Sequence, residues 1–213
     1  AGNPYYIDLQ LLTEQGLLQP GEAAAPDWGL RPDWVDYAKL YANRFLVLKK
    51  AWSRSRWEQD TDFSDFCRKN RTWLEDYALF MALKDSFGGR EWQAWPEEIR
   101  LRRPAALADW QKRLRQETIF WKYVQYLFFS QWERLKDYAN QKGIRMIGDI
   151  PIYVAMDSAD VWIGGSRFQL DENRQPTAVA GVPPDLFSAT GQLWGNPLYD
   201  WQAMEQDGFS WWR

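Results

Sequence analysis

The stretch that decides the fold is GIRMIGDIPIYV, residues 143–154. A long helical pattern precedes it, from Pro104 to Gln141, with apolar residues recurring every three, four or seven positions. Gly143 ends this helix, and Ile144–Ile150 is short, isoleucine-rich and mostly apolar, which predicts a buried parallel strand that stops at Pro151. A helix, a glycine, a strand and a loop in this order are the repeating unit of an α/β barrel. In such barrels the functional residues follow the carboxyl ends of the strands.

The helix predicted before this strand carries one apolar stripe. Aromatic residues at helical spacing usually pack in a core, so we interpret the stripe as core rather than as ligand platforms. Its members are Leu107, Trp110, Leu114, Trp121, Phe128, Trp132, Leu135 and Ala139.

Further helical patterns lie nearer the N-terminus. A short helix is expected within residues 7–18, followed by a linker rich in Pro, Gly and Ala at residues 20–34. A longer helix is expected from Val35 to Trp57. The next helical pattern includes Phe66 to Met81, with a cap expected among Asp62–Ser64 and an end at Gly88.

Composition excludes several classes of function. Twenty-six basic and 29 acidic residues give a net charge of −3, which argues against nucleic acid as a partner. No run of 18 apolar residues predicts a membrane span, and the first residues lack both a signal pattern and an initiator Met, so we expect a processed or cut chain.

Cysteine and histidine usage narrows the chemistry. The single cysteine, Cys67, excludes an intramolecular disulfide and fits a reducing cytosol, so we expect a cytoplasmic protein. The chain has no histidine, which excludes the usual metal sites and Ser-His-Asp catalysis. We therefore expect neither a metal nor a cofactor.

The segment from Gly148 to Trp201 has the composition of a carbohydrate cleft. Its prolines predict shaped loops, and its acids and amides suit sugar hydroxyls: Asp149, Asp157, Asp185 and Asn196. Its large aromatic side chains offer flat faces for pyranose rings: Trp162, Phe187, Trp194, Tyr199 and Trp201. The alternative is a structured surface loop whose aromatics pack on its own core. Trp162 fits that alternative better than it fits a platform.

Several long motifs resemble the amylomaltases, the bacterial 4-α-glucanotransferases also called disproportionating enzymes. The resemblance extends over the whole chain. The motifs are AGNPYYIDLQLL (1–12), WLEDYALFMALK (73–84), FFSQWERLKDYANQKGIR (128–145), GDIPIYV (148–154), DSADVW (157–162) and AGVPPDLFSATGQLWGNPLYDW (180–201).

The resemblance implies an α/β fold, part of a (β/α)8 TIM barrel with a large helical insertion. The expected division is a barrel loop, short helix and linker at residues 1–32, a helical insertion subdomain at 33–142, and a barrel strand with substrate-cleft loops at 143–213. The implied activity is transfer of α-1,4-glucan segments from a donor to an acceptor glucan or glucose. The mechanism would be a retaining double displacement, with an Asp nucleophile and a Glu acid/base.

The resemblance also implies what the chain lacks. The family nucleophile lies in an Arg-x-Asp-His pattern, and these 213 residues contain no histidine. We therefore expect an internal piece of the enzyme that holds no catalytic residue and is inactive alone. Its partner would be an α-1,4-glucan or maltooligosaccharide. The residues expected to bind it are Asp149, Asp185, Phe187, Gln192, Trp194 and Asn196.

Two other functions stay open at this point. A non-catalytic glucan-binding module would explain the aromatics without a nucleophile. A stand-alone glycosidase could use Asp149 with Asp185 or Asp157, and its carboxylates would lie about 5–5.5 Å apart for retention or about 6.5–9.5 Å for inversion. For Asp157, Ser158 and Asp160 the simpler role is to cap the following turn.

Overall fold

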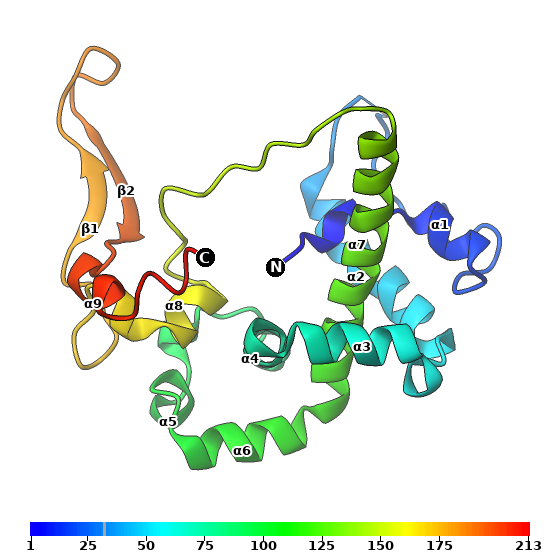
Figure 1. The fold of residues 1–213 in the computed structure, drawn as a ribbon, viewed down its shortest axis with the longest axis horizontal. Coiled ribbons are helices and arrows are strands. Elements are labelled where there is room, and N and C mark those ends of the chain that lie inside the picture. Colours follow the sequence, from blue (N-terminus) through cyan, green and yellow to red (C-terminus); the bar gives the residue numbers. More distant parts are fainter. Residues whose placement is uncertain (32) are drawn as a thin grey trace. The chain divides into compact units, whose positions relative to one another are not determined.

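A computed structural model describes residues 1–31 and 33–213, which form two compact units (Figure 1). Unit 1 comprises residues 1–78 and 116–147, and unit 2 comprises residues 79–115 and 148–213. Each unit is described by itself. The expected division into residues 1–32, 33–142 and 143–213 stays a prediction.

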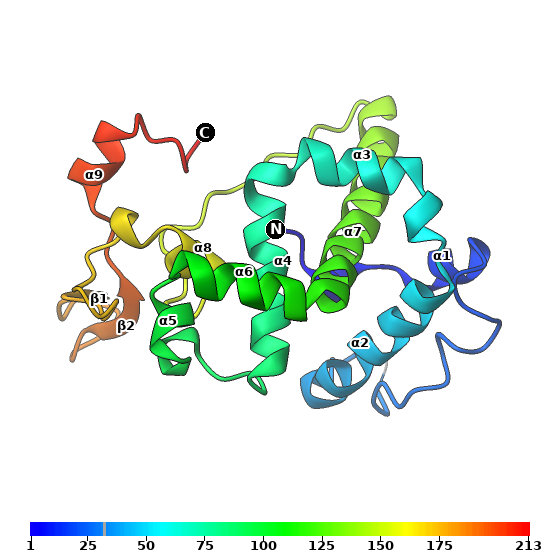
Figure 2. The ribbon, with the colours of Figure 1, turned by 90° about the horizontal axis from the view of Figure 1, so that it is seen from below.

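Unit 1 is helical and is built around one long helix. Its elements are α1 (Leu9–Glu14), α2 (Tyr37–Arg54), α3 (Thr61–Lys69), the first half of α4 (Arg71–Ser86) and nearly all of α7 (Arg115–Gln141). With 27 residues, α7 is the longest of these helices, and it is the green helix labelled α7 in Figure 2. Its aromatic side chains contact those of α2, α3 and α4, with ring centroids 5.0 Å apart for Trp121 and Phe45 and 5.6 Å apart for Tyr126 and Phe63. Helix α7 therefore organises the core of unit 1.

The apolar stripe is only partly core. Trp121 and Ala139 are buried, as expected, but Trp132 and Leu135 are exposed. The single helix expected over Pro104–Gln141 is also wrong, because it is divided at Leu114 into α6 (Pro104–Arg113) and α7. Leu114 leaves helical geometry and packs against the core of unit 2, whereas α7 from Gln116 onward belongs to unit 1.

Aspartates begin the helices of unit 1. Asp8, Asp36 and Asp60 each accept a backbone N–H of the first turn, at 2.8 Å, 3.1 Å and 2.9 Å respectively. The cap of α3 is therefore Asp60, and the expected cap among Asp62–Ser64 is wrong, because the helix already begins at Thr61.

Unit 2 combines short helices with one hairpin. It contains the second half of α4, α5 (Glu97–Arg100), α6, α8 (Ala159–Ile163) and α9 (Trp201–Gln206). Strands β1 (Val179–Val182) and β2 (Gln192–Pro197) pair antiparallel, with Gly181 opposite Leu193 and Val182 opposite Gln192. A core of large side chains, including Leu83, Trp92 and Trp162, fills the unit.

The segment Ile144–Ile150 does not form the predicted strand. It is irregular, and Ile144, Ile147 and Ile150 are exposed. A parallel strand is stable only when neighbouring strands satisfy its backbone groups and cover its faces. Within the described residues, no strand pairs with this segment. Its composition is that of a buried strand without the neighbours that a strand requires.

None of the helices in the described ranges is long and apolar enough to cross a membrane. The same residues contain no group of three or more Cys, Asp or Glu side chains placed to hold a metal ion.

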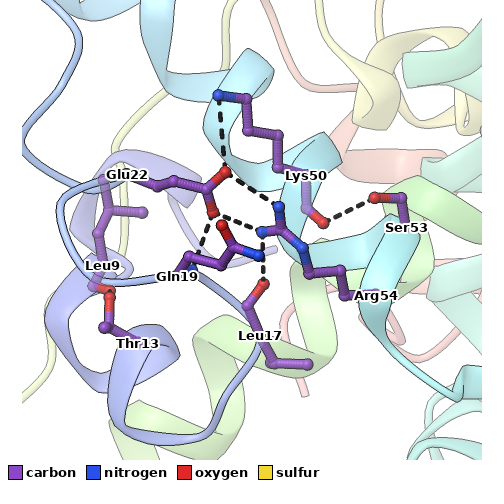
Figure 3. A network of polar contacts seen from close by, with 8 residues as sticks. All are labelled: Leu9, Thr13, Leu17, Gln19, Glu22, Lys50, Ser53 and Arg54. Carbon is purple, nitrogen blue, oxygen red and sulfur yellow. Dashed lines mark hydrogen bonds and ion pairs between the residues drawn. The ribbon is translucent and has the colours of Figure 1, made fainter.

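A polar network joins the loop after α1 to the end of α2 (Figure 3). The Glu22 carboxylate accepts hydrogen bonds from both terminal nitrogens of Arg54, at 2.5 Å and 2.9 Å, and from the Gln19 N–H at 2.9 Å. Lys50 Nζ lies 3.9 Å away. The Arg54 hydrogen bond, supported by the Gln19 N–H, lowers the pKa of Glu22 to about 2.

We expect the Glu22 network to make stability depend on acidic pH. A carboxyl whose pKa is lowered by folding stabilises the fold above its unfolded pKa of about 4.3, and this contribution is lost as the pH falls towards 2. Glu22→Gln should therefore melt earlier than the unmodified chain at pH 6, and the difference should vanish near pH 2. Thermal melts between pH 2 and 7 test this expectation, and a difference that is constant across that range contradicts it.

Candidate carbohydrate site

The candidate site lies on the hairpin of unit 2. Figure 1 shows β1 and β2 extending from the α8–α9 region, with the loop of residues 183–191 at the tip. Gly191 closes this loop with a φ of +72°, and a Cβ there would lie 2.6 Å from the Val182 carbonyl oxygen. Only glycine fits such a position without a shift of the backbone.

Asp185 and Phe187 occupy the loop. Asp185 Oδ1 accepts the N–H groups of Phe187 and Ser188 at 2.9 Å and 2.8 Å, so this carboxylate shapes the turn. Phe187 is 93% exposed. A phenyl ring in that position can cover a ligand but contributes little to the core.

Gln192, Trp194 and Asn196 are every second residue of β2. Trp194 Nε1 donates a hydrogen bond to Gln192 Oε1 at 2.9 Å, so these two side chains share one side of the strand. Asn196 Nδ2 donates to the Val154 carbonyl oxygen at 2.8 Å. Asn196 therefore fastens β2 to the segment before α8. Trp194 is 45% exposed and offers an accessible indole.

Asp149 lies on the irregular segment before Pro151. Its Oδ1 accepts the N–H of Ile150 at 2.8 Å, and within the described ranges no hydrogen bond joins it to the hairpin. Five of the six expected binding residues are thus brought onto one hairpin, and Asp149 lies on a different segment of the chain.

The aromatic side chains behind the hairpin are core. Tyr199 is buried, so the expectation that it offers a flat face to sugars is wrong, whereas the burial of Trp162 agrees with its interpretation as a packing residue. The Trp162 indole donates to the Ile99 carbonyl oxygen at 3.0 Å, and burial raises the pKa of Tyr199. Trp201 is exposed, as a platform requires.

The DSADVW motif is structural. Asp157 Oδ2 lies 2.6 Å from Lys84 Nζ, and its Oδ1 accepts the Trp92 N–H at 3.2 Å. Ser158 caps α8 through the Val161 N–H, and Asp160 accepts the Trp211 indole N–H at 2.9 Å. An aspartate in an ion pair with Lys84 holds two segments of unit 2 together, which leaves it poorly placed to act as a glycosidase carboxylate.

Tyr153 is an aromatic residue of the site that is not predicted from the sequence. Tyr153 lies between Trp194 and Tyr199, with ring centroids 6.0 Å from each. The sequence around Tyr153 shows only that an aromatic residue stands two positions after Pro151. Its ring partners, Trp194 and Tyr199, lie far away in the chain.

We expect Tyr199→Phe to keep or raise the stability of unit 2. The Tyr199 hydroxyl is buried, and no described residue gives it a hydrogen-bond partner. A buried polar group without a partner costs about 1–3 kcal/mol, so its removal should gain up to about 1 kcal/mol. Tyr77→Phe is the matched control, because the Tyr77 hydroxyl accepts the Gln125 amide at 3.3 Å. Urea denaturation of both variants tests the prediction, and a clear loss for Tyr199→Phe contradicts it.

A sequence model of the 4-alpha-glucanotransferase family matches residues 1–213. The chain belongs to this family. The 4-alpha-glucanotransferase of Clostridium butyricum is 44% identical over all of this chain and 44% of its own length. That of Thermus thermophilus is 48% identical over all of this chain and 42% of its own length. The chain thus spans less than half the length of the relatives that it matches.

Solved structures of this family agree. The amylomaltase of Streptococcus agalactiae in complex with acarbose is 41% identical, with a TM-score of 0.92 over all of this chain and 43% of its own. The amylomaltase of Corynebacterium glutamicum is 18% identical, with a TM-score of 0.70 over 97% of this chain and 28% of its own, and supports the fold alone. The expected fold class is confirmed: the chain is part of the α/β (β/α)8 enzyme fold, with a large helical insertion.

Proposed function

We propose that the protein containing this chain is a 4-α-glucanotransferase that moves α-1,4-glucan segments from a donor to an acceptor glucan or glucose. The observation that carries the proposal is the family match over residues 1–213. The relatives bear this name, and the Streptococcus agalactiae amylomaltase was solved with acarbose.

The proposed reaction is a retaining double displacement. An aspartate attacks the anomeric carbon while an acid protonates the leaving oxygen, and the acceptor hydroxyl then displaces the aspartate as the same group takes up its proton. In our proposal this chain supplies binding rather than the nucleophile, and the enzyme acts in the cytoplasm without a cofactor.

Within this chain, we assign glucan binding to the hairpin face. The exposed Trp194 indole offers a flat apolar surface for a pyranose ring, and Phe187 lies on the adjoining loop. The amide of Gln192, bonded to the indole, retains donors for sugar hydroxyls. Asp149, Asp185 and Asn196 complete the proposed set, with Asp185 and Asn196 also shaping the hairpin.

Trp194→Ala should weaken binding of maltoheptaose about tenfold, or about 1.4 kcal/mol, while the melting temperature stays nearly unchanged. A half-exposed indole contributes binding surface but little core. Trp121→Ala is the matched control, because this indole is buried against Phe45 and its loss should cost about 3–5 kcal/mol of stability. Calorimetric titration and thermal melting of both variants decide between the roles. If Trp194→Ala melts early and its folded fraction binds normally, Trp194 is a packing residue.

A further inference from the structure

Tyr153 occupies a defined place between a buried and an exposed aromatic ring. On one side it stacks on Tyr199, with an interplanar angle of 14°. On the other side it meets Trp194 edge to face, at 69°. Tyr153 itself is half-buried and packs against the core of unit 2. A continuous aromatic path therefore runs from the core to the exposed indole.

The inner end of this path is fixed. Tyr199 is 2% exposed, and Phe168, Trp201, Trp211 and Trp212 surround its ring with centroids 5.2–5.7 Å away. Its backbone pairs with that of Phe168 in an isolated antiparallel bridge. A ring enclosed in this way provides a rigid base on which Tyr153 can stack.

The outer end has two restraints. Gln192 holds the nitrogen edge of the Trp194 indole, and Tyr153 meets its ring. The Asn196 bond to the Val154 carbonyl oxygen keeps residues 153–154 beside β2. Of these two restraints on the indole, only the hydrogen bond to the exposed Gln192 side chain would remain without the Tyr153 ring, so we expect its orientation to vary more.

We propose that Tyr153 is a positioning residue for carbohydrate at Trp194. It transmits the rigidity of the Tyr199 cluster to the indole and so holds one face ready for the apolar face of a glucose ring. Preorganisation of this kind raises affinity because the entropy of ordering the side chain is lost before the ligand arrives. The proposal deepens the glucan-binding role proposed above and rests on it.

The test uses the 213-residue chain, with maltoheptaose as the ligand. Tyr153→Leu removes the ring but keeps an apolar side chain, and should weaken binding roughly 3- to 10-fold, the range of one aromatic pair. Tyr153→Phe restores the ring and should recover that loss. In a Trp194→Ala background, Tyr153→Leu should cause no further weakening, because a positioning residue acts through the residue that it positions. Tyr138→Leu, at an exposed tyrosine of α7, is the matched control.

A second measurement separates positioning from general damage. In spectra of chain labelled with 15N-tryptophan, Tyr153→Leu should shift or broaden the indole N–H signal of Trp194. The signal of Trp162, whose indole donates to the buried Ile99 carbonyl oxygen, should stay in place. If both signals move, Tyr153 is a core residue of unit 2, and the proposal is wrong.

The remaining outcomes are distinct. Equal weakening by Tyr153→Leu with and without Trp194 means that Tyr153 touches the glucan itself, which overturns positioning. If the unmodified chain does not bind maltoheptaose, the assignment of binding to the hairpin fails. In that case the indole N–H signal of Trp194 alone tests whether Tyr153 positions the indole. A signal that Tyr153→Leu leaves unchanged refutes that role.

Discussion

The 213-residue chain alone should release no glucose from maltotriose above the uncatalysed rate. Retaining transfer requires a nucleophilic carboxylate and a second carboxyl, whose raised pKa allows it to act as the acid, about 5–5.5 Å apart. Among the described residues, the carboxyls whose pKa the structure shifts all have it lowered: Glu22, Asp27, Asp33, Asp65 and Asp207. None of them is prepared to protonate a leaving group at neutral pH.

Two aspartates of unit 2 already make structural contacts. Asp157 is paired with Lys84, and Asp185 accepts two backbone N–H groups of its own loop. Enzymes accelerate reactions by about 10⁶-fold or more, so the contrast between presence and absence of catalysis is large. Glucose should be measured after incubation with maltotriose, and folding should be checked by maltoheptaose binding. Turnover within the ordinary enzyme range would show that the catalytic acids are in this chain.

The helices could be predicted from the sequence because their signals are local. The helix expected from Val35 to Trp57 is α2, and the one expected to end at Gly88 comprises α3 and α4. Spacing and caps act within a few residues, so they can be interpreted without tertiary structure. The break at Leu114 could not be predicted in this way. The apolar spacing of a helix continues through Leu114, but its packing on the core of unit 2 ends α6 there.

The strands could not be predicted in the same way. Ile144–Ile150 has the side chains of a buried strand, but pairing depends on neighbours that composition does not reveal. Conversely, β2 contains Gly195, Asn196 and Pro197, which are poor strand residues, and it pairs with β1 through a nine-residue loop. The composition of the whole segment therefore predicts shaped loop rather than strand.

The candidate site was predictable where its residues are near in sequence. Gln192, Trp194 and Asn196 are spaced by two, so a strand places them together. Tyr153 could not be found, because it lies 41 positions before Trp194 in the sequence and meets it only when the chain folds back. The residues that flank Trp162 and Trp194 in the sequence are similar in kind, yet Trp162 is buried and Trp194 is half-exposed.

Trp162→Ala should have the largest effect on stability, about 5 kcal/mol, the upper end of the range for a buried aromatic residue. Trp162 is fully buried, and its ring contacts Phe80 and Trp95 with centroids 5.8 Å from each. The Arg102 guanidinium lies 4.2 Å from the ring centroid. Alanine would remove the ring at the centre of this cluster and leave a cavity that the surrounding rings can fill only in part.

Two variants isolate the cause of this loss. Trp162→Phe keeps a ring and removes the indole N–H. The Ile99 carbonyl oxygen would still accept the Arg102 N–H at 3.1 Å, so we expect a smaller cost of about 1–3 kcal/mol. Trp201→Ala is the matched control, because this tryptophan of unit 2 is 56% exposed and should cost clearly less than Trp162→Ala.

The measurement must report on unit 2, because two compact units can unfold in separate transitions and obscure a single midpoint. Hydrogen exchange of the Val161 and Leu83 amides, both in the core of unit 2, provides that report. Trp162→Ala should reduce the protection of both amides by several orders of magnitude, since about 1.4 kcal/mol corresponds to a factor of ten. Protection that falls no further than in Trp201→Ala would mean that the cluster collapses around the missing ring, and that Trp162 is not the centre of the unit 2 core.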